Sequence, residues 1–303
     1  MKSLLYFLLL FFVSGCISIS RQQRGVIRQF AGKTENFASV PEQIMVQLGN
    51  VREARGLYYA NSFNDPSTHL SELKEIAKER FKDDKIPGKV KLAFMILDEY
   101  AKGLVQLSSD VPGKETGKLY GQLGKQLEVL TAQYNLSVPL RPIPTGLVQA
   151  VSQLLDGATQ QYLAGRQCRE LKRVVSKADT LVALVCDEMV NFLSSDGLEK
   201  LITNEVSGVE ESFRFYFTKR SPPSIESEQT YLELLKKVEK IKIVQKQAIR
   251  TAQNLKSAHK KLGESLKYKL KPNEFLTDLM SYYHEADLLW SNIQAVMEKS
   301  QNK

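Results

Sequence analysis

The sequence of this chain predicts an all-α fold, a bundle of long antiparallel helices. Three observations support this prediction. Apolar residues recur at three-to-four spacing through most of the chain, stretches that alternate like strands are scarce, and a segment near the C-terminus keeps a heptad pattern. The chain has 303 residues, of which 43% are hydrophobic and 25% are charged. This composition excludes disorder of the whole chain, and the length allows one large domain or two smaller ones.

The first residues are typical of an export signal. Met1 and Lys2 are followed by an unbroken apolar run over residues 4–13, which has the length of a signal-peptide core and is too short to cross a bilayer. The run ends in Val13-Ser14-Gly15-Cys16, which resembles the lipobox of bacterial lipoproteins. This resemblance implies cleavage before Cys16, a diacylglycerol on its sulfur and acylation of the new amino terminus.

The same resemblance implies where the protein works. Residues 1–15 are the expected signal peptide, and two or three acyl chains on Cys16 attach a protein stably to a membrane outside the cytoplasm. Ile17, in place of Asp, implies the outer membrane if the host has two membranes. An ordinary secretory leader with a chance cysteine is the alternative. Residues 16–38 contain Gly, Ser and Gln with weak periodicity, and we expect them to form a tether or a frayed helix.

Residues 39–134 form the expected N-terminal helical region. Its first helix starts where Ser39, Pro41 and Glu42 make the pattern of a capping box, and it runs to a turn at residues 61–65. A second helix is expected after Asp65, which precedes a proline. A third follows the turn at residues 86–88, and a fourth runs from about residue 114 to 134.

Residues 135–146 hold three prolines, which indicates a crossover or a domain boundary. Residues 147–303 form the expected C-terminal helical region, either a second domain or part of one continuous bundle. Its helices are expected over residues 147–193 with a break at Gly157 or Gly165, from Ser195 to about Arg220, and over about 225–270 and 272–299. Residues 212–218 alternate like a strand, but a lone strand has no partner, so we interpret them as the end of a helix.

The segment 231–271 carries both the heptad pattern and the basic excess. The whole chain has a formal net charge of +8, whereas this segment alone has +9. Most of its charges lie off the heptad seam, in which Gln245 and His259 are the polar residues. We interpret the seam as packing inside an intramolecular bundle, with a dimer seam as the alternative.

The basic side chains of this segment are the candidate residues for binding a partner or an anion. They are Lys236, Lys237, Lys240, Lys246, Arg250, Lys260 and Lys261. One interpretation is a solvated face that keeps a long helix soluble. The other is an anionic partner, such as lipid headgroups, envelope polymers or an acidic protein. Nucleic acid is not expected as a partner, because the export signal and the lack of a Gly-rich aromatic motif argue against it.

A cluster of charged and aromatic residues precedes the turn at residues 61–65. It can be a recognition surface, or an ion pair within one helix accompanied by packed tyrosines. The residues are Arg52, Glu53, Arg55, Tyr58 and Tyr59.

Catalytic and metal-binding patterns are not found in the sequence. The three histidines lack the spacing of metal ligands, and no Gly-x-Ser-x-Gly or P-loop motif occurs. Cys168 and Cys186 would stand about 27 Å apart on one continuous helix, too far for a disulfide, so we expect buried free thiols.

The sequence therefore predicts a non-enzymatic lipoprotein of the cell envelope, a helical scaffold or protein-binding module with no cofactor and no metal. Its expected partners are the membrane, through the lipid on Cys16, and a protein of the envelope. Binding of anionic lipid or envelope polymers through the helix over 231–271 is the alternative, and an enzyme is the third possibility. The oligomeric state stays open.

Overall fold

The computed structural model describes residues 20–83, 88–109, 114–137, 142–157, 164–268 and 272–297. Within these ranges the chain is helical and has no strand, which confirms the predicted all-α bundle. Cys16 and the rest of the leader lie outside the described residues. The helices are α2 (Arg21–Ala38), α3 (Val40–Ala60), α4 (Pro66–Asp83), α5 (Gly88–Leu107), α6 (Lys114–Ser137), α7 (Thr145–Gly157), α8 (Ala164–Leu193), α9 (Asp196–Lys219), α10 (Ile225–Tyr268) and α11 (Pro272–Met297).

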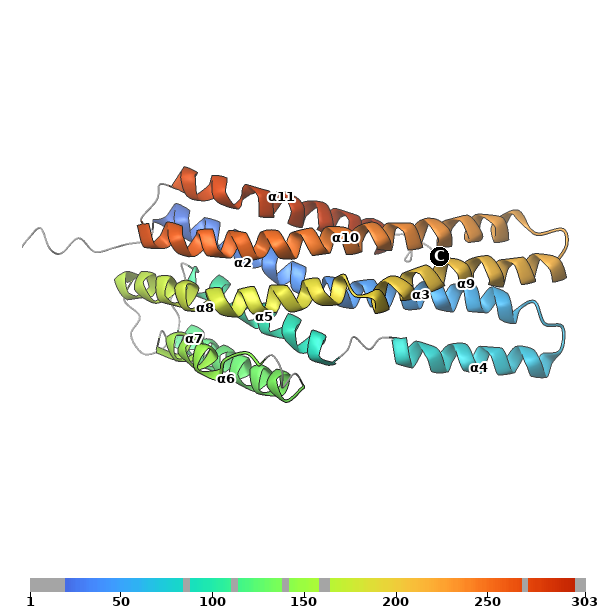
Figure 1. Ribbon diagram of the computed structural model, residues 1–303, viewed down its shortest axis with the longest axis horizontal. Helices are drawn as coiled ribbons and strands as arrows, with labels where there is room; N and C mark the ends of the chain where they lie inside the picture. Colours follow the sequence, from blue (N-terminus) through green and yellow to red (C-terminus); the bar gives the residue numbers. More distant parts are fainter. Residues whose placement is uncertain are drawn as a thin grey trace, which may run out of the picture.

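The bundle is elongated, and α10 runs along most of its length (Figure 1). With 44 residues, this helix is about 66 Å long at 1.5 Å per residue. Helices α8 and α11 pack along its C-terminal half, whereas α9 and α3 pack along its N-terminal half. One apolar core includes residues of both predicted regions, so residues 39–134 and 147–303 pack together. None of the helices in the described ranges is long and apolar enough to cross a membrane.

Residues 21–38 form α2, so the prediction of a tether or a frayed helix is wrong for them. The helix starts at a complete capping box, in which the Ser20 hydroxyl accepts from the Gln23 backbone N–H (3.1 Å) and the Gln23 side chain accepts from the Ser20 N–H (2.9 Å). Val26, Phe30 and Phe37 are buried at helical spacing against the core. Two glycines interrupt the apolar pattern of this segment in the sequence, but the apolar face of α2 is large enough to hold the helix against the core.

The capping box predicted at Ser39 does not form. The Ser39 backbone is itself helical, and its hydroxyl donates to the Asn36 carbonyl (2.8 Å) instead of accepting from α3. Pro41 occupies the first turn of α3, where its missing N–H costs nothing. Helices α2 and α3 therefore follow each other with one residue between them, and they carry the chain from one end of the bundle to the other (Figure 1).

The Pro-rich segment 135–146, of which the structure describes residues 135–137 and 142–146, includes the end of α6 and the start of α7. Asn135 fixes it, because its side-chain amide donates to the Ile143 carbonyl (2.8 Å) and its side-chain oxygen accepts from the Ile143 N–H (2.7 Å). Helices α6 and α7, on either side, pack against each other. The break expected at Gly157 or Gly165 falls between α7 and α8, and residues 212–218 lie within α9, as the helical interpretation predicted.

Candidate interaction surfaces on the long helix

Helix α10 buries the predicted heptad seam, including both of its polar residues. Gln245 is satisfied because its side-chain amide donates to the Leu193 carbonyl (2.6 Å) at the end of α8. A carbonyl in the last turn of a helix has no partner within that helix, so Gln245 ties the end of α8 to α10.

His259 joins three helices inside the core. Its Nε2 lies 2.6 Å from the Tyr100 hydroxyl of α5, and its Nδ1 lies 3.0 Å from Asp179 Oδ1 of α8. The hydrogen bond from His259 lowers the pKa of Asp179, whereas burial raises the pKa of Tyr100 well above its ordinary value. Because each ring nitrogen has a protein partner, His259 serves to hold α5, α8 and α10 together.

The seven candidate basic residues do not form one patch. Lys236, Lys240 and Lys246 are exposed in the N-terminal half of α10, and Arg250 is exposed just past its middle; these four residues make no ion pair with any described residue. Lys237 is half-buried, and burial lowers its pKa. Lys260 and Lys261 are exposed near the other end of α10, and 24 residues separate Lys236 from Lys260, or about 36 Å along the helix.

The N-terminal half of α10 also exposes apolar side chains that the sequence analysis missed. Ile225, Leu232 and Ile243 are between 44% and 74% exposed. Their spacings of 7 and 11 residues place them on one side of the helix, opposite the buried seam, at about 100° per residue. We name this surface the outer face of α10. Its residues are Ile225, Leu232, Lys236, Lys240, Ile243, Lys246 and Arg250.

The other end of α10 contributes to a second basic surface. Figure 1 shows the end of α10 beside the starts of α2, α8 and α11. Hydrogen bonds tie α2 to two of its neighbours here: Tyr283 of α11 donates to the Val26 carbonyl of α2 (2.9 Å), and Arg28 of α2 donates to the Ser108 carbonyl after α5 (2.6 Å). We name this surface the basic end. Its exposed cationic residues are Arg21, Arg28, Arg173, Lys260, Lys261 and Lys267.

In the cluster predicted around Arg52 and Arg55, the two arginines form an ion group between two helices, α3 and α9, and not only contacts within one helix. Glu205 of α9 accepts from Arg52 Nε (2.7 Å) and from Arg55 Nε (2.9 Å), with a further contact to the Arg52 guanidinium. Its carboxylate side chain is only 1% exposed. The partner lies about 150 positions away in the sequence, which no spacing rule within α3 can reveal.

The two tyrosines of this cluster pack against the aromatic run of α9, at the end of the bundle opposite the start of α2 (Figure 1). Tyr58 lies on Phe213, with ring centroids 4.4 Å apart, and Tyr59 lies on Phe215 at 5.4 Å. Phe213 also contacts Tyr231 of α10. The apparent strand alternation therefore arises because rings on different sides of α9 meet different neighbouring helices.

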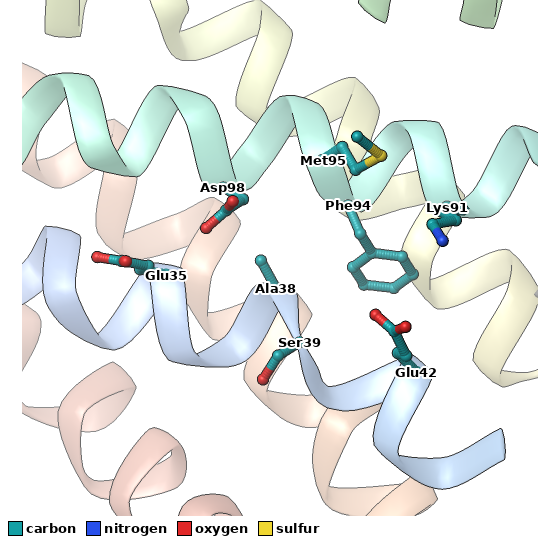
Figure 2. A pocket seen from close by; sticks show the side chains of 8 residues that line it. All are labelled: Glu35, Ala38, Ser39, Glu42, Lys91, Phe94, Met95 and Asp98. Atoms are coloured by element: carbon teal, nitrogen blue, oxygen red, sulfur yellow. The ribbon is translucent and has the colours of Figure 1, made fainter. Parts of the chain in front are cut away.

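Between helices of the described part of the chain lie two pockets of note. The first has a volume of about 170 Å³ and lies between the junction of α2 and α3 on one side and α5 on the other. Figure 2 shows its carboxylates spread along it, with Glu35 and Asp98 on one side of Ala38 and Glu42 near Lys91 on the other. Because they do not converge on one point, they do not form an acid–base pair. The second pocket, of about 420 Å³, has a mainly apolar lining and borders Lys89, close to residues 84–87, which lie outside the described chain.

Cys186 is a buried free thiol, as expected, and burial raises its pKa to about 12. The side chain of Cys168 lies outside the described part, although α8 is continuous between the two positions. Across the described side chains, no group of three or more His, Cys, Asp or Glu residues is placed to hold a metal ion. No protein-family model, curated protein or solved structure matches this chain.

Proposed function

We propose that this protein is a lipoprotein anchored through Cys16 to the outer side of a cell membrane, where it acts as a non-enzymatic helical scaffold that binds another envelope protein. The observation that carries the proposal is that the start of the described chain and the outer face of α10 lie in different halves of the bundle. The described chain starts at Ser20 at one end, and the outer face of α10 lies in the other half (Figure 1).

The reach of the chain limits how far the body can lie from such an anchor. Cys16 precedes Ser20 by four residues, which span at most about 14 Å even when fully extended. Acylation of Cys16 therefore keeps the start of α2 close to the bilayer. An elongated bundle held at that end presents its far half to other proteins of the envelope.

The outer face of α10 is the surface that best suits a protein partner. It combines apolar side chains with exposed cationic ones over residues 225–250, a length of about 38 Å. Helix α11 packs along the C-terminal half of α10, and in the described part of the chain Ile225, Leu232 and Ile243 on this side of the N-terminal half stay exposed. An amphipathic helix with acidic residues beside its apolar stripe is complementary to this surface in both respects.

Crosslinking in cells tests this proposal. A photoreactive amino acid at Ile243, which is 44% exposed, lies in the outer face. One at Val129 of α6, which is 55% exposed on another helix, serves as the control. We expect a defined adduct from position 243 and none from position 129. Changing Lys236, Lys240 and Lys246 to Glu in the same chain should abolish the adduct, because acidic residues repel an acidic partner. Adducts from both positions, or from neither, would contradict the proposal.

A further inference from the structure

Exposed cationic side chains from several helices gather at the end of the molecule where α2 starts. Six exposed Lys and Arg residues form the basic end. The acidic residues beside them in the described segments include the exposed Glu264 and Glu274 and the partly exposed Asp179, which interacts with Lys260. Three helices, α2, α8 and α10, supply the cationic side chains, so a lysine-rich pattern on a single helix does not account for them.

We infer that the basic end is a docking surface for the anionic face of a lipid bilayer. The inference rests on the proposed anchor, because the start of α2 belongs to this surface and Cys16 is at most about 14 Å of chain away from Ser20. A lipid attached there keeps the start of α2 within about two Debye lengths of the headgroups at physiological salt, since each is about 8 Å, and the bundle can approach closer than the fully extended chain allows. The attraction then turns the long axis of the bundle away from the membrane plane.

An aromatic residue supports a membrane over a soluble anion as the partner. Tyr268, at the end of α10, is 66% exposed, and the Lys267 ammonium lies 5.3 Å from the centre of its ring. Tyrosine and lysine side chains side by side suit the boundary between headgroups and water, where the ring enters the interface and the ammonium meets phosphates.

Vesicle flotation tests the inference without the anchor. The chain from Ile17 to Lys303 keeps every residue that the structure describes, and it is mixed with vesicles of phosphatidylcholine alone or with 30% phosphatidylglycerol, a composition chosen for about the charge of a bacterial surface. We expect binding to the anionic vesicles only, lost in 0.5 M salt because of screening.

Charge reversal on the two halves of α10 locates the surface. Each basic residue close to an anionic surface strengthens binding about fivefold, so changing Lys260, Lys261 and Lys267 to Glu should weaken it about a hundredfold or more. Changing Lys236, Lys240 and Lys246 to Glu makes the same change in net charge on the same helix and should leave most of the binding. All six residues are exposed, and circular dichroism checks that both variants keep the parent's helicity.

Each possible result of these binding experiments either supports or overturns the inference. Loss in the first variant alone supports the inference. Equal loss in both variants overturns it, because net charge and not the basic end then drives binding. Absence of binding by the parent chain, or equal binding to neutral vesicles, also overturns it. Because this chain carries no lipid, the result is independent of whether Cys16 is acylated in cells, which is tested separately.

Discussion

Truncation of Glu205 tests whether one buried ion group holds α3 against α9, near the end of the bundle that displays the outer face. Glu205 is 1% exposed, and the side chains of its partners Arg52 and Arg55 are 20% and 23% exposed. Removing the buried carboxylate takes the ion-pair partner from Arg55 and one partner from Arg52, and breaking a buried ion group costs about 3–5 kcal/mol. Glu205→Ala should therefore lower the free energy of unfolding by about this amount, even though Ala is the better helix former.

The assay is urea denaturation followed by far-ultraviolet circular dichroism, with linear extrapolation to water. Glu211→Ala is the matched control on the same helix, because Glu211 is exposed and lies 3.9 Å from Arg214. It should change the free energy of unfolding by no more than about 0.5 kcal/mol. A loss below about 1 kcal/mol for Glu205→Ala would refute the reasoning.

A third variant separates the ion group from the space that it fills. Replacing Arg52 and Arg55 by Met and Glu205 by Leu removes every charge and keeps most of the buried volume. Since apolar replacement of a buried ion group is often neutral or stabilising, this variant should recover to within about 1 kcal/mol of the parent. If it stays as unstable as Glu205→Ala, the loss arises from packing and not from unpaired charge.

The remaining predictions concern local packing and ionisation. Gly124→Ala should lower the free energy of unfolding by about 1–3 kcal/mol in urea denaturation, because the added Cβ would lie 3.0 Å from a backbone oxygen of α7. Gly32→Ala should instead raise it by about 0.5–1 kcal/mol, because the space around Gly32 is open and Ala is the better helix former. Hydrogen bonds from the two hydroxyls and the backbone N–H of the following turn hold the pKa of Asp65 at about 2, below its ordinary 3.8. The parent should therefore have a higher free energy of unfolding than Asp65→Ala, and this difference should be complete above about pH 5 and disappear as the pH falls through 2. A difference that stays the same between pH 5 and pH 2 would contradict this. Cys186, in a chain whose other two cysteines are changed to serine, should react with a thiol reagent at neutral pH only after unfolding, and rapid labelling of the native chain would be inconsistent with its burial.

The sequence predicts helix boundaries well where turn chemistry is explicit. Ser195 caps α9, and Pro272 opens α11. It fails at Ser39, because a serine hydroxyl can donate to the preceding turn as readily as it can accept from the following one, and the pattern of residue types is the same in both cases. Helix α2 was predictable in principle, since Ser20 and Gln23 form a capping box and the apolar residues after them keep helical spacing.

The candidate surfaces were only partly predictable. The basic residues of α10 follow from composition, but their separation into the outer face and the basic end depends on which part of α10 each neighbouring helix covers. Spacing within one helix carries no information about that coverage. The same limit applies to Glu205, whose arginine partners come from a helix distant in the sequence. The exposed stripe of Ile225, Leu232 and Ile243 could have been found from its helical phase, opposite the heptad seam.

Mass spectrometry of the amino-terminal peptide tests the central claim most directly. The full chain is produced in a bacterium that processes lipoproteins, and it is isolated from separated membrane and soluble fractions. The proposed function requires a peptide that begins at Cys16, recovered from the membrane and heavier than the bare sequence by a diacylglycerol and an acyl group. A chain in the soluble fraction that still begins at Met1, with an unmodified thiol at Cys16, would contradict it.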